Sequence, residues 1–244
     1  MGQTEVNSPK EIEPDMHHPD AEQSPFNAIP PAVLLLAGVM AGVEIAFQAG
    51  EAGFVGGPGS IGWRLEAVRS YGFLDPIWDW MLSNGRAPMD HLIRLLTYPF
   101  IHASLTHAAF AVVIVLAIGK SVGEIYSAVS VLLTFFGASI FAAAAYGTVM
   151  TTQAPLFGGY PGAYGLIGAF TYLLWIRLEA VGENSMRAFT LIAVLMGLQL
   201  IYGIMFGPDP TWFADLMGFV AGFGLAFVVR PGGWTRLLSR LRQR

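Results

Sequence analysis

The sequence predicts an all-α membrane protein built on a bundle of six transmembrane helices. Of its 244 residues, 54% are hydrophobic and only 12% are charged, whereas a soluble globular chain carries about 25% charged residues. The apolar residues gather in blocks of about 20, which is the length that crosses a hydrocarbon core of about 30 Å. Because no backbone polar group can stay unpaired inside a membrane, each block is expected to be a helix.

We expect the six spans at residues 29–48, 103–119, 125–147, 157–176, 188–206 and 211–229. The second block is short, and the apolar residues 95–101 before it are expected to extend it. Residues 1–28 are polar and acidic, without the apolar core of a signal peptide, and we interpret them as a disordered tail. Residues 29–231 form the expected transmembrane domain. Residues 232–244 form a basic tail that we interpret as an anchor on anionic lipid.

The distribution of basic residues predicts the orientation. Of the 13 Lys and Arg residues, four lie in the long loop after the first span, and the others lie in the two tails or in the two turns on the opposite side. Because basic residues favour the cytoplasmic side, both termini are predicted to be cytoplasmic. The acidic tail and the lack of a sorting signal favour a bacterial plasma membrane.

The loop at residues 49–90 is too long for a plain connection. Asp75 is expected to cap a helix in which Pro76 takes the first position and Gly85 supplies the stop. A shorter helix is expected at residues 63–70. We interpret both as interfacial helices in the lipid headgroup region, and the alternative is a small outer cap that does not touch the membrane.

Several kinds of site find no support in the sequence. There is no cysteine, which excludes disulfides and thiolate chemistry. His102 and His107 are five residues apart, which places them about 140° apart around a helix, so they do not form an i, i+4 metal pair. The glycines of residues 158–168 open an apolar helix without a lysine, unlike a phosphate loop. We therefore expect no metal, no cofactor and no nucleic-acid partner.

Three acids or histidines fall well inside the expected spans: Glu44, His107 and Asp215. Such residues are costly in a bilayer and usually face the interior of the bundle, where they serve a function. The alternatives are that Glu44 reaches the membrane surface, that His107 is a satisfied core histidine, and that Asp215 is an interface acid.

Two of the spans carry small residues at regular spacing. Such faces allow two helices to pack closely inside a membrane. In the fourth span they are Gly158, Gly162, Gly165 and Ala169, and in the sixth they are Ala214, Gly218 and Gly222. Tyr160 and Asp215 lie near the outer ends of these same two spans.

Residues 94–230 contain several motifs whose order and spacing resemble those of the rhomboid family of intramembrane serine proteases. RLLTYPFIHASLTH, ending at His107, is similar to the family's arginine and threonine followed by H-x-S-x-x-H, with His102, Ser104 and His107 at its three named positions. Gly119 and Glu124 match the glycine and glutamate that follow. GLIGAF, residues 165–170, resembles the core of the fourth helix. ADLMGFVAG, residues 214–222, resembles the sixth-helix motif that carries the catalytic histidine.

The catalytic residues of the family are missing. Rhomboids use a Ser–His dyad whose serine lies in G-x-S-G before the fourth helix. Alignment through GLIGAF places Tyr160 at the serine position, and alignment through GYPG places Pro161 there. Asp215 stands at the histidine position and Ala111 at that of the oxyanion-site asparagine, so His107 alone remains. A phenol with a pKa near 10 is a poor substitute for an activated serine.

The resemblance therefore implies a pseudoprotease that binds transmembrane segments of other proteins within the lipid bilayer. In it we expect the Tyr160 hydroxyl to hydrogen-bond to Asp215, and Pro161 to begin the fourth helix. One alternative is an active intramembrane serine-type endopeptidase with Ser104 or Thr97 as nucleophile. Further alternatives are a small-molecule or ion pathway through Glu44, His107 and Asp215, and a structural role in one membrane complex.

Overall fold

The structure is a computed structural model that describes residues 28–207 and 209–229. Within these ranges all regular elements are helices, and one isolated antiparallel bridge joins Phe73 to Leu156. The all-α prediction is confirmed. Apart from Ala28, the two expected tails, 1–28 and 232–244, lie outside the described residues.

Six long helices make up the bundle. They are α1 (Pro31–Glu51), α6 (Leu105–Gly123), α7 (Ala128–Val149), α8 (Tyr160–Ala180), α9 (Thr190–Phe206) and α10 (Trp212–Val229). The short helix η3 (Ser185–Phe189) leads directly into α9. By length and composition, five stretches of the described chain are able to cross a membrane: α1, α6, α7, η3 with α9, and α10.

The helix α8 is as long as the others but is not among these five. Of its 21 residues, 11 are buried, and many of these are glycine, alanine or tyrosine. It packs on α10, α7 and α6, and its buried residues, which all lie between 161 and 172, include many small ones that allow close packing. The count of six spans therefore stays a prediction that depends on α8.

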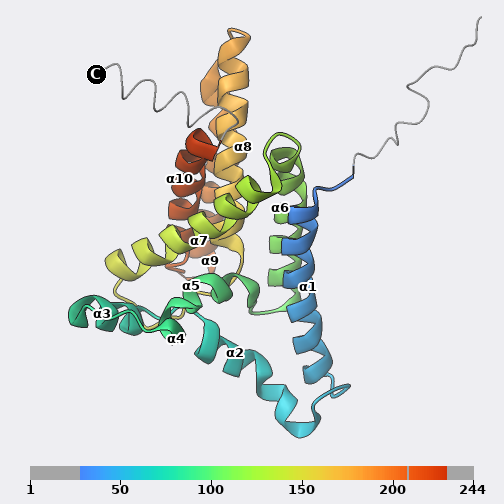
Figure 1. The fold of residues 1–244 in the computed structure, drawn as a ribbon, viewed down its shortest axis with the longest axis vertical. Helices are drawn as coiled ribbons and strands as arrows, with labels where there is room; N and C mark the ends of the chain where they lie inside the picture. Colours follow the sequence, from blue (N-terminus) through green and yellow to red (C-terminus); the bar gives the residue numbers. More distant parts are fainter. Residues whose placement is uncertain (1–27, 208, 230–244) are drawn as a thin grey trace, which may run out of the picture.

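The ends of the helices separate into two groups (Figure 1). The start of α1, the end of α10 and the turns α6–α7 and α8–α9 lie towards the top of the view. The long loop after α1 lies at the bottom, together with its helices. This arrangement brings the start and the end of the described bundle to the same side.

The long loop is mostly helical. It contains η1 (Gly57–Gly62), α2 (Trp63–Tyr71), α3 (Asp75–Asn84), α4 (Met89–Leu92), α5 (Arg94–Thr97) and η2 (Tyr98–Phe100). The expected helices at 63–70 and after residue 75 are confirmed, and Gly85 ends α3 with a left-handed φ of 59°. The capping role of Asp75 was wrong. Leu74 is the N-cap, and Asp75 Oδ2 instead accepts a hydrogen bond from Thr152 N at 2.9 Å, which ties the long loop to the loop before α8.

The second span was predicted incorrectly at its start. Residues 95–101 do not extend α6, because the chain turns at residues 101–104 and the Ser104 Oγ atom caps the helix by accepting from His107 N at 3.2 Å. A serine that binds the first free N–H groups is a strong start signal, and Pro99, within η2, cannot donate to a continuous helix. The helix reaches its length by running on to Gly123.

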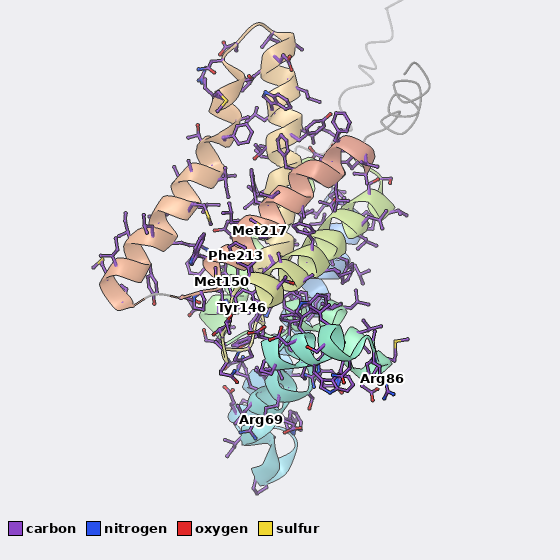
Figure 2. The ribbon with its side chains drawn as sticks, turned by 90° about the vertical axis from the view of Figure 1, so that its left-hand side faces the viewer. Arg69, Arg86, Tyr146, Met150, Phe213 and Met217 are labelled. Carbon is purple, nitrogen blue, oxygen red and sulfur yellow. The ribbon has the colours of Figure 1, made fainter. Side chains whose placement is uncertain are left out.

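The helix α9 leans away from the bundle (Figure 2). Ile192 is its one buried residue. The opposite side of α10 is well packed, with Phe213 and Met217 in one cluster with Tyr146 of α7 and with Met150, which follows α7. The structure therefore holds α10 firmly through α7 and α8, and α9 loosely.

The contact between α8 and α10 is made by backbone. A Cβ atom on Gly222 would overlap the Gly165 carbonyl oxygen, and one on Gly218 would overlap that of Pro161. Gly162 instead faces α7, where a Cβ would lie 2.7 Å from Ser139 Oγ. Gly158 precedes α8, so it does not share a helical face with Gly162 as the spacing predicted.

Candidate functional site

The candidate site lies where the start of α8 meets the turn before α6. Two backbone donors fix the start of α8. Gly158 N donates to Tyr98 O at 2.9 Å, and Gly159 N donates to His102 Nε2 at 3.3 Å. Gly158 has a φ of 109°, and a Cβ there would come within 2.9 Å of His107 Cε1. A residue with a side chain is excluded on both grounds, so this glycine lets the imidazole approach the helix start.

Tyr160 is the first residue of α8, and its ring stacks on His107. The ring centroids are 4.9 Å apart and the planes differ by 16°. The Tyr160 hydroxyl donates to the carbonyl oxygen of His107 at 3.4 Å. Pro161 follows in the first helical turn, as expected, and is buried. The phenol ring therefore covers the imidazole face.

The expected hydrogen bond between Tyr160 and Asp215 was wrong. No hydrogen bond joins the two among the described residues, because the stack on His107 directs the hydroxyl to a backbone carbonyl. Asp215 is 4% exposed, and its Oδ2 atom accepts from Gln199 Nε2 of α9 at 2.7 Å. Sequence reasoning missed Gln199. The available signal was a lone amide side chain in an otherwise apolar span.

The two hydroxyl groups considered as nucleophiles are engaged elsewhere. Ser104 caps α6, and the His107 Nδ1 atom beside it accepts from Ala103 N at 3.1 Å, so this nitrogen is not free to take a proton from Ser104. Thr97 Oγ1 donates to Tyr71 O and Ile93 O. Ala111 is fully buried and offers no donor. In the described part of the chain, neither hydroxyl is hydrogen-bonded to a side-chain base.

The two histidines meet, contrary to the prediction from their spacing. Their ring centroids are 5.5 Å apart. The predicted angle of about 140° assumed one continuous helix, but His102 lies in the turn before α6. No group of three or more His, Cys, Asp or Glu side chains is arranged to hold a metal ion in residues 28–207 and 209–229.

Glu44 is buried inside the protein and is 2% exposed. Its partner is Arg64 of α2, whose Nη1 lies 2.8 Å from Glu44 Oε2. The Arg64 side chain also binds Glu51 at 2.8 Å and the carbonyl oxygen of His102 at 2.6 Å. The hydrogen bond to Glu44 raises the pKa of Arg64 above its usual range. Sequence reasoning counted Arg64 only for orientation, because the partner of a loop residue cannot be read from spacing.

His102 gives the stability of the protein a pH dependence. Burial, and then the neighbouring His107, lower the pKa of His102 from 6.5 to about 4, against the opposing effect of Glu44. Between these two pH values the unfolded chain binds the proton and the folded protein does not. Stability therefore falls as the pH drops through this window. A pKa change of this size corresponds to a loss of about 3 kcal/mol in the free energy of unfolding.

We expect thermal unfolding curves between pH 7 and pH 4 to show this loss. In a His102→Gln variant the slope of stability against pH should be shallower, since the amide does not titrate and its oxygen can still accept from Gly159 N. Equal slopes in the two proteins would show that other groups cause the acid sensitivity.

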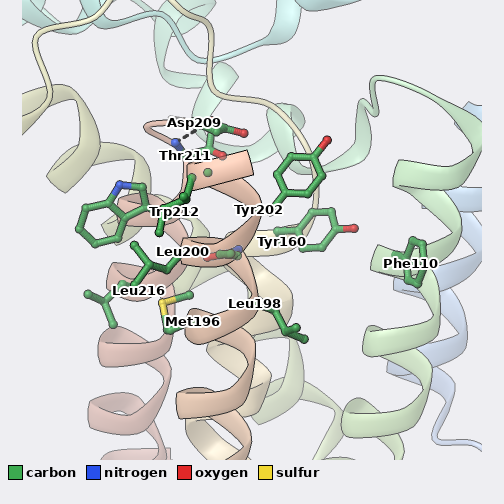
Figure 3. A pocket seen from close by; sticks show the side chains of 13 residues that line it. Phe110, Tyr160, Met196, Leu198, Leu200, Tyr202, Asp209, Thr211, Trp212 and Leu216 are labelled. Carbon is green, nitrogen blue, oxygen red and sulfur yellow. Dashed lines mark hydrogen bonds between the residues drawn. The ribbon is translucent and has the colours of Figure 1, made fainter. Parts of the chain in front are cut away.

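A cavity of about 880 Å³ opens beside Tyr160, between α6, α8, α9 and α10 (Figure 3). Its walls are mostly apolar. The lining residues are Phe110, Tyr160, Met196, Leu198, Gln199, Leu200, Tyr202, Gly203, Ile204, Asp209, Thr211, Trp212 and Leu216. Phe110 of α6 lies across the opening from the side chains of α9 and α10. We call this cavity the α6–α9 pocket.

Comparisons of the sequence with known proteins identify a matching family model and a curated relative. Residues 89–232 match the family model described as the Rhomboid domain. The chain is 28% identical over 137 residues to Rhomboid-like protease 3 of Toxoplasma gondii. That match covers 55% of this chain and 50% of the relative, so the chain spans about half the length of the curated relative it matches.

Proposed function

The chain belongs to the rhomboid family of membrane proteins, and we propose that it is a member without protease activity that binds transmembrane segments of partner proteins. The stack of Tyr160 on His107 is the observation that carries this proposal. It fills, with an unreactive ring, the place where the resemblance puts the nucleophile. The α6–α9 pocket beside it supplies the binding surface.

Acyl transfer by a serine protease needs an attacking side chain and a base that takes its proton. At the aligned positions this chain has Tyr160 and Asp215. Their side chains bind His107 O and Gln199, respectively, and not each other. Ala111 removes a donor that would stabilise an oxyanion. All three substitutions favour the same conclusion, that the site no longer cleaves peptide bonds.

The binding role is supported by the loose packing of α9. A partner helix binds where an apolar surface fits it better than it fits lipid. Small movements of α9 can adjust the width of the pocket to such a helix. Phe110 is 62% exposed and Leu198 is 57% exposed on its two sides. In the membrane we propose an orientation with both termini cytoplasmic, in a bacterial plasma membrane. The start of α1 lies on the same side as the turns α6–α7 and α8–α9, which supports the proposed cytoplasmic position of both termini.

A serine-directed fluorophosphonate probe tests the loss of activity. We expect no labelling of the purified full chain in vesicles, under conditions in which an active rhomboid protease is labelled. If the chain is labelled and the label is lost on Ser104→Ala or Thr97→Ala, the protein is an enzyme with an unusual nucleophile and the proposal is wrong.

Site-specific photocrosslinking tests the binding role. A photoreactive phenylalanine at position 110 should form adducts with single transmembrane segments in the native membrane. The same residue at Phe141, which is 49% exposed on α7 and does not line the pocket, is the matched control. Equal adducts at the two positions would indicate random encounters in the bilayer and would count against the pocket as a binding site.

A further inference from the structure

We propose that the α6–α9 pocket selects a transmembrane helix that carries one basic side chain at the depth of Asp215. This inference rests on the proposed function, and it adds the chemistry of the partner. The juxtaposition behind it is the amide of Gln199, which lines an otherwise apolar pocket, and the buried carboxyl group of Asp215 that this amide binds.

The first observation is the unfinished hydrogen bonding of this pair. Gln199 lines the pocket, and its Nε2 atom donates a hydrogen bond to Asp215 Oδ2 at 2.7 Å. The Gln199 Oε1 atom is buried and has no donor among the described residues. The side chain of Asp215 has no other hydrogen bond in the described part of the chain. A buried acceptor without a donor is unfavourable, so a group that brings donors to this place is stabilised there.

The second observation is charge. Asp209 also lines the pocket, at its outer edge, and no lysine, arginine or histidine is among the lining residues. The basic side chains that form ion pairs in the described ranges, Arg64 and Arg187, are bound to glutamates elsewhere. Asp209 is therefore the one charged residue among the described residues that line the pocket, and no basic side chain in the lining balances it. Complementary charge across an interface gives selectivity among partners.

The chemistry of the donor distinguishes the candidate partners. An ammonium group carries three N–H donors, enough for the Gln199 amide oxygen and the Asp215 carboxyl group behind it, whereas a hydroxyl group has one donor. A fully apolar helix leaves both acceptors as they are. A basic side chain inside a bilayer is itself costly, and it gains the most from an acid at the same depth.

The depth of the pair favours a helix side chain over a lipid headgroup. Gln199 lies seven residues before the last residue of α9, Phe206, which is about 10 Å along the helix axis. A side chain on a transmembrane helix reaches that level directly. A headgroup amine would have to leave the interface to do so.

The experiment uses the full chain in phosphatidylcholine vesicles with three synthetic peptides. Each is a leucine–alanine transmembrane helix of about 20 residues, with one lysine, one serine or neither at the depth of Asp215. Energy transfer between labelled chain and peptide measures affinity. We expect the lysine peptide to bind at least tenfold more tightly than the apolar peptide, a ratio that corresponds to about 1.4 kcal/mol.

Variants of the chain identify the groups responsible. Asp215→Asn, which keeps the shape of the side chain, should reduce the preference for lysine to less than about twofold, and Gln199→Leu should weaken it. Asp209→Asn should leave most of it. The comparison of the three peptides uses the unaltered chain, so it tests the preference for lysine even if the Asp215→Asn variant does not fold.

Several outcomes would overturn the inference. Equal binding of the three peptides would do so while leaving the proposed function in place, and tighter binding of the serine peptide would indicate a neutral donor. Loss of the preference on Asp209→Asn but not on Asp215→Asn would move the contact to the outer edge. Competition by phosphatidylethanolamine would assign the site to a headgroup. Binding of no peptide, together with no crosslink at Phe110, would contradict the proposed function as well.

Discussion

Replacing Gly222 with valine is expected to prevent α8 and α10 from packing and to unfold the protein at moderate temperature. A Cβ atom at this position would overlap the carbonyl oxygen of Gly165, and the Cα atom of Gly165 would lie only 2.5 Å away. These atoms belong to the backbone of a buried helix and cannot rotate out of the way. Overpacking of a core costs about 1–3 kcal/mol when side chains can yield, and we expect a loss at or above the upper end.

The matched control for this experiment is Gly224→Val on the same helix. A Cβ at Gly224 has no neighbour within 4 Å, so the change in helix propensity is the same and the steric conflict is absent. Intrinsic tryptophan fluorescence on heating in detergent measures both variants. Similar melting temperatures for the two variants would show that α8 and α10 do not pack through these glycines.

Replacing Arg64 with glutamine is expected to have the second large effect, because it leaves Glu44 buried without its counterion. Removing one partner of a buried ion pair costs about 3–5 kcal/mol, and Glu44 is only 2% exposed. The loss of the hydrogen bond to His102 O adds to this cost, since Arg64 joins the long loop after α1 to the turn that precedes α6. The free energy of unfolding, from denaturation in mixed detergent, measures the loss.

Two further variants separate the charge from the shape of Arg64. The double variant Arg64→Gln/Glu44→Gln removes both charges and should recover most of the lost stability. Arg187→Gln breaks an ion pair whose side chains are 68% and 52% exposed and should cost less than about 0.5 kcal/mol. If the double variant were as unstable as Arg64→Gln, the long loop after α1 would depend on the arginine for reasons other than the buried carboxylate.

The sequence was sufficient for the helices, because the hydrophobic blocks and the capping residues act locally. Gly85 ended α3 where its backbone freedom predicted. The exceptions have local causes as well. Ser104 starts a new helix inside an apolar stretch. The helix α8 forms at the fourth expected block, 157–176, but it is not among the five stretches able to cross a membrane by length and composition. A helix that faces lipid over most of its surface has an apolar composition, whereas 11 of the 21 residues of α8 are buried within the protein.

The site was predicted by position but not by pairing. Tyr160, His107 and Asp215 were identified from their places in the motifs, yet the partners of Tyr160 and Asp215 were not. Which hydrogen bond forms depends on the rotation of each helix about its axis and on which group lies nearest. The Tyr160 side chain stacks on His107 and binds its carbonyl oxygen, and it does not bind Asp215. Gln199 and Arg64 were missed for the same reason, since each completes a contact between elements that are separate in the sequence.

One measurement tests most directly whether this rhomboid binds without cutting. A transmembrane peptide with one lysine is captured by the photoreactive residue at position 110 after several hours with the full chain in vesicles, and the mass of the adduct is determined. We predict an adduct that contains the whole peptide, with no shorter fragment in the vesicles. An adduct or a free fragment shortened within the transmembrane segment would show that the protein is a protease.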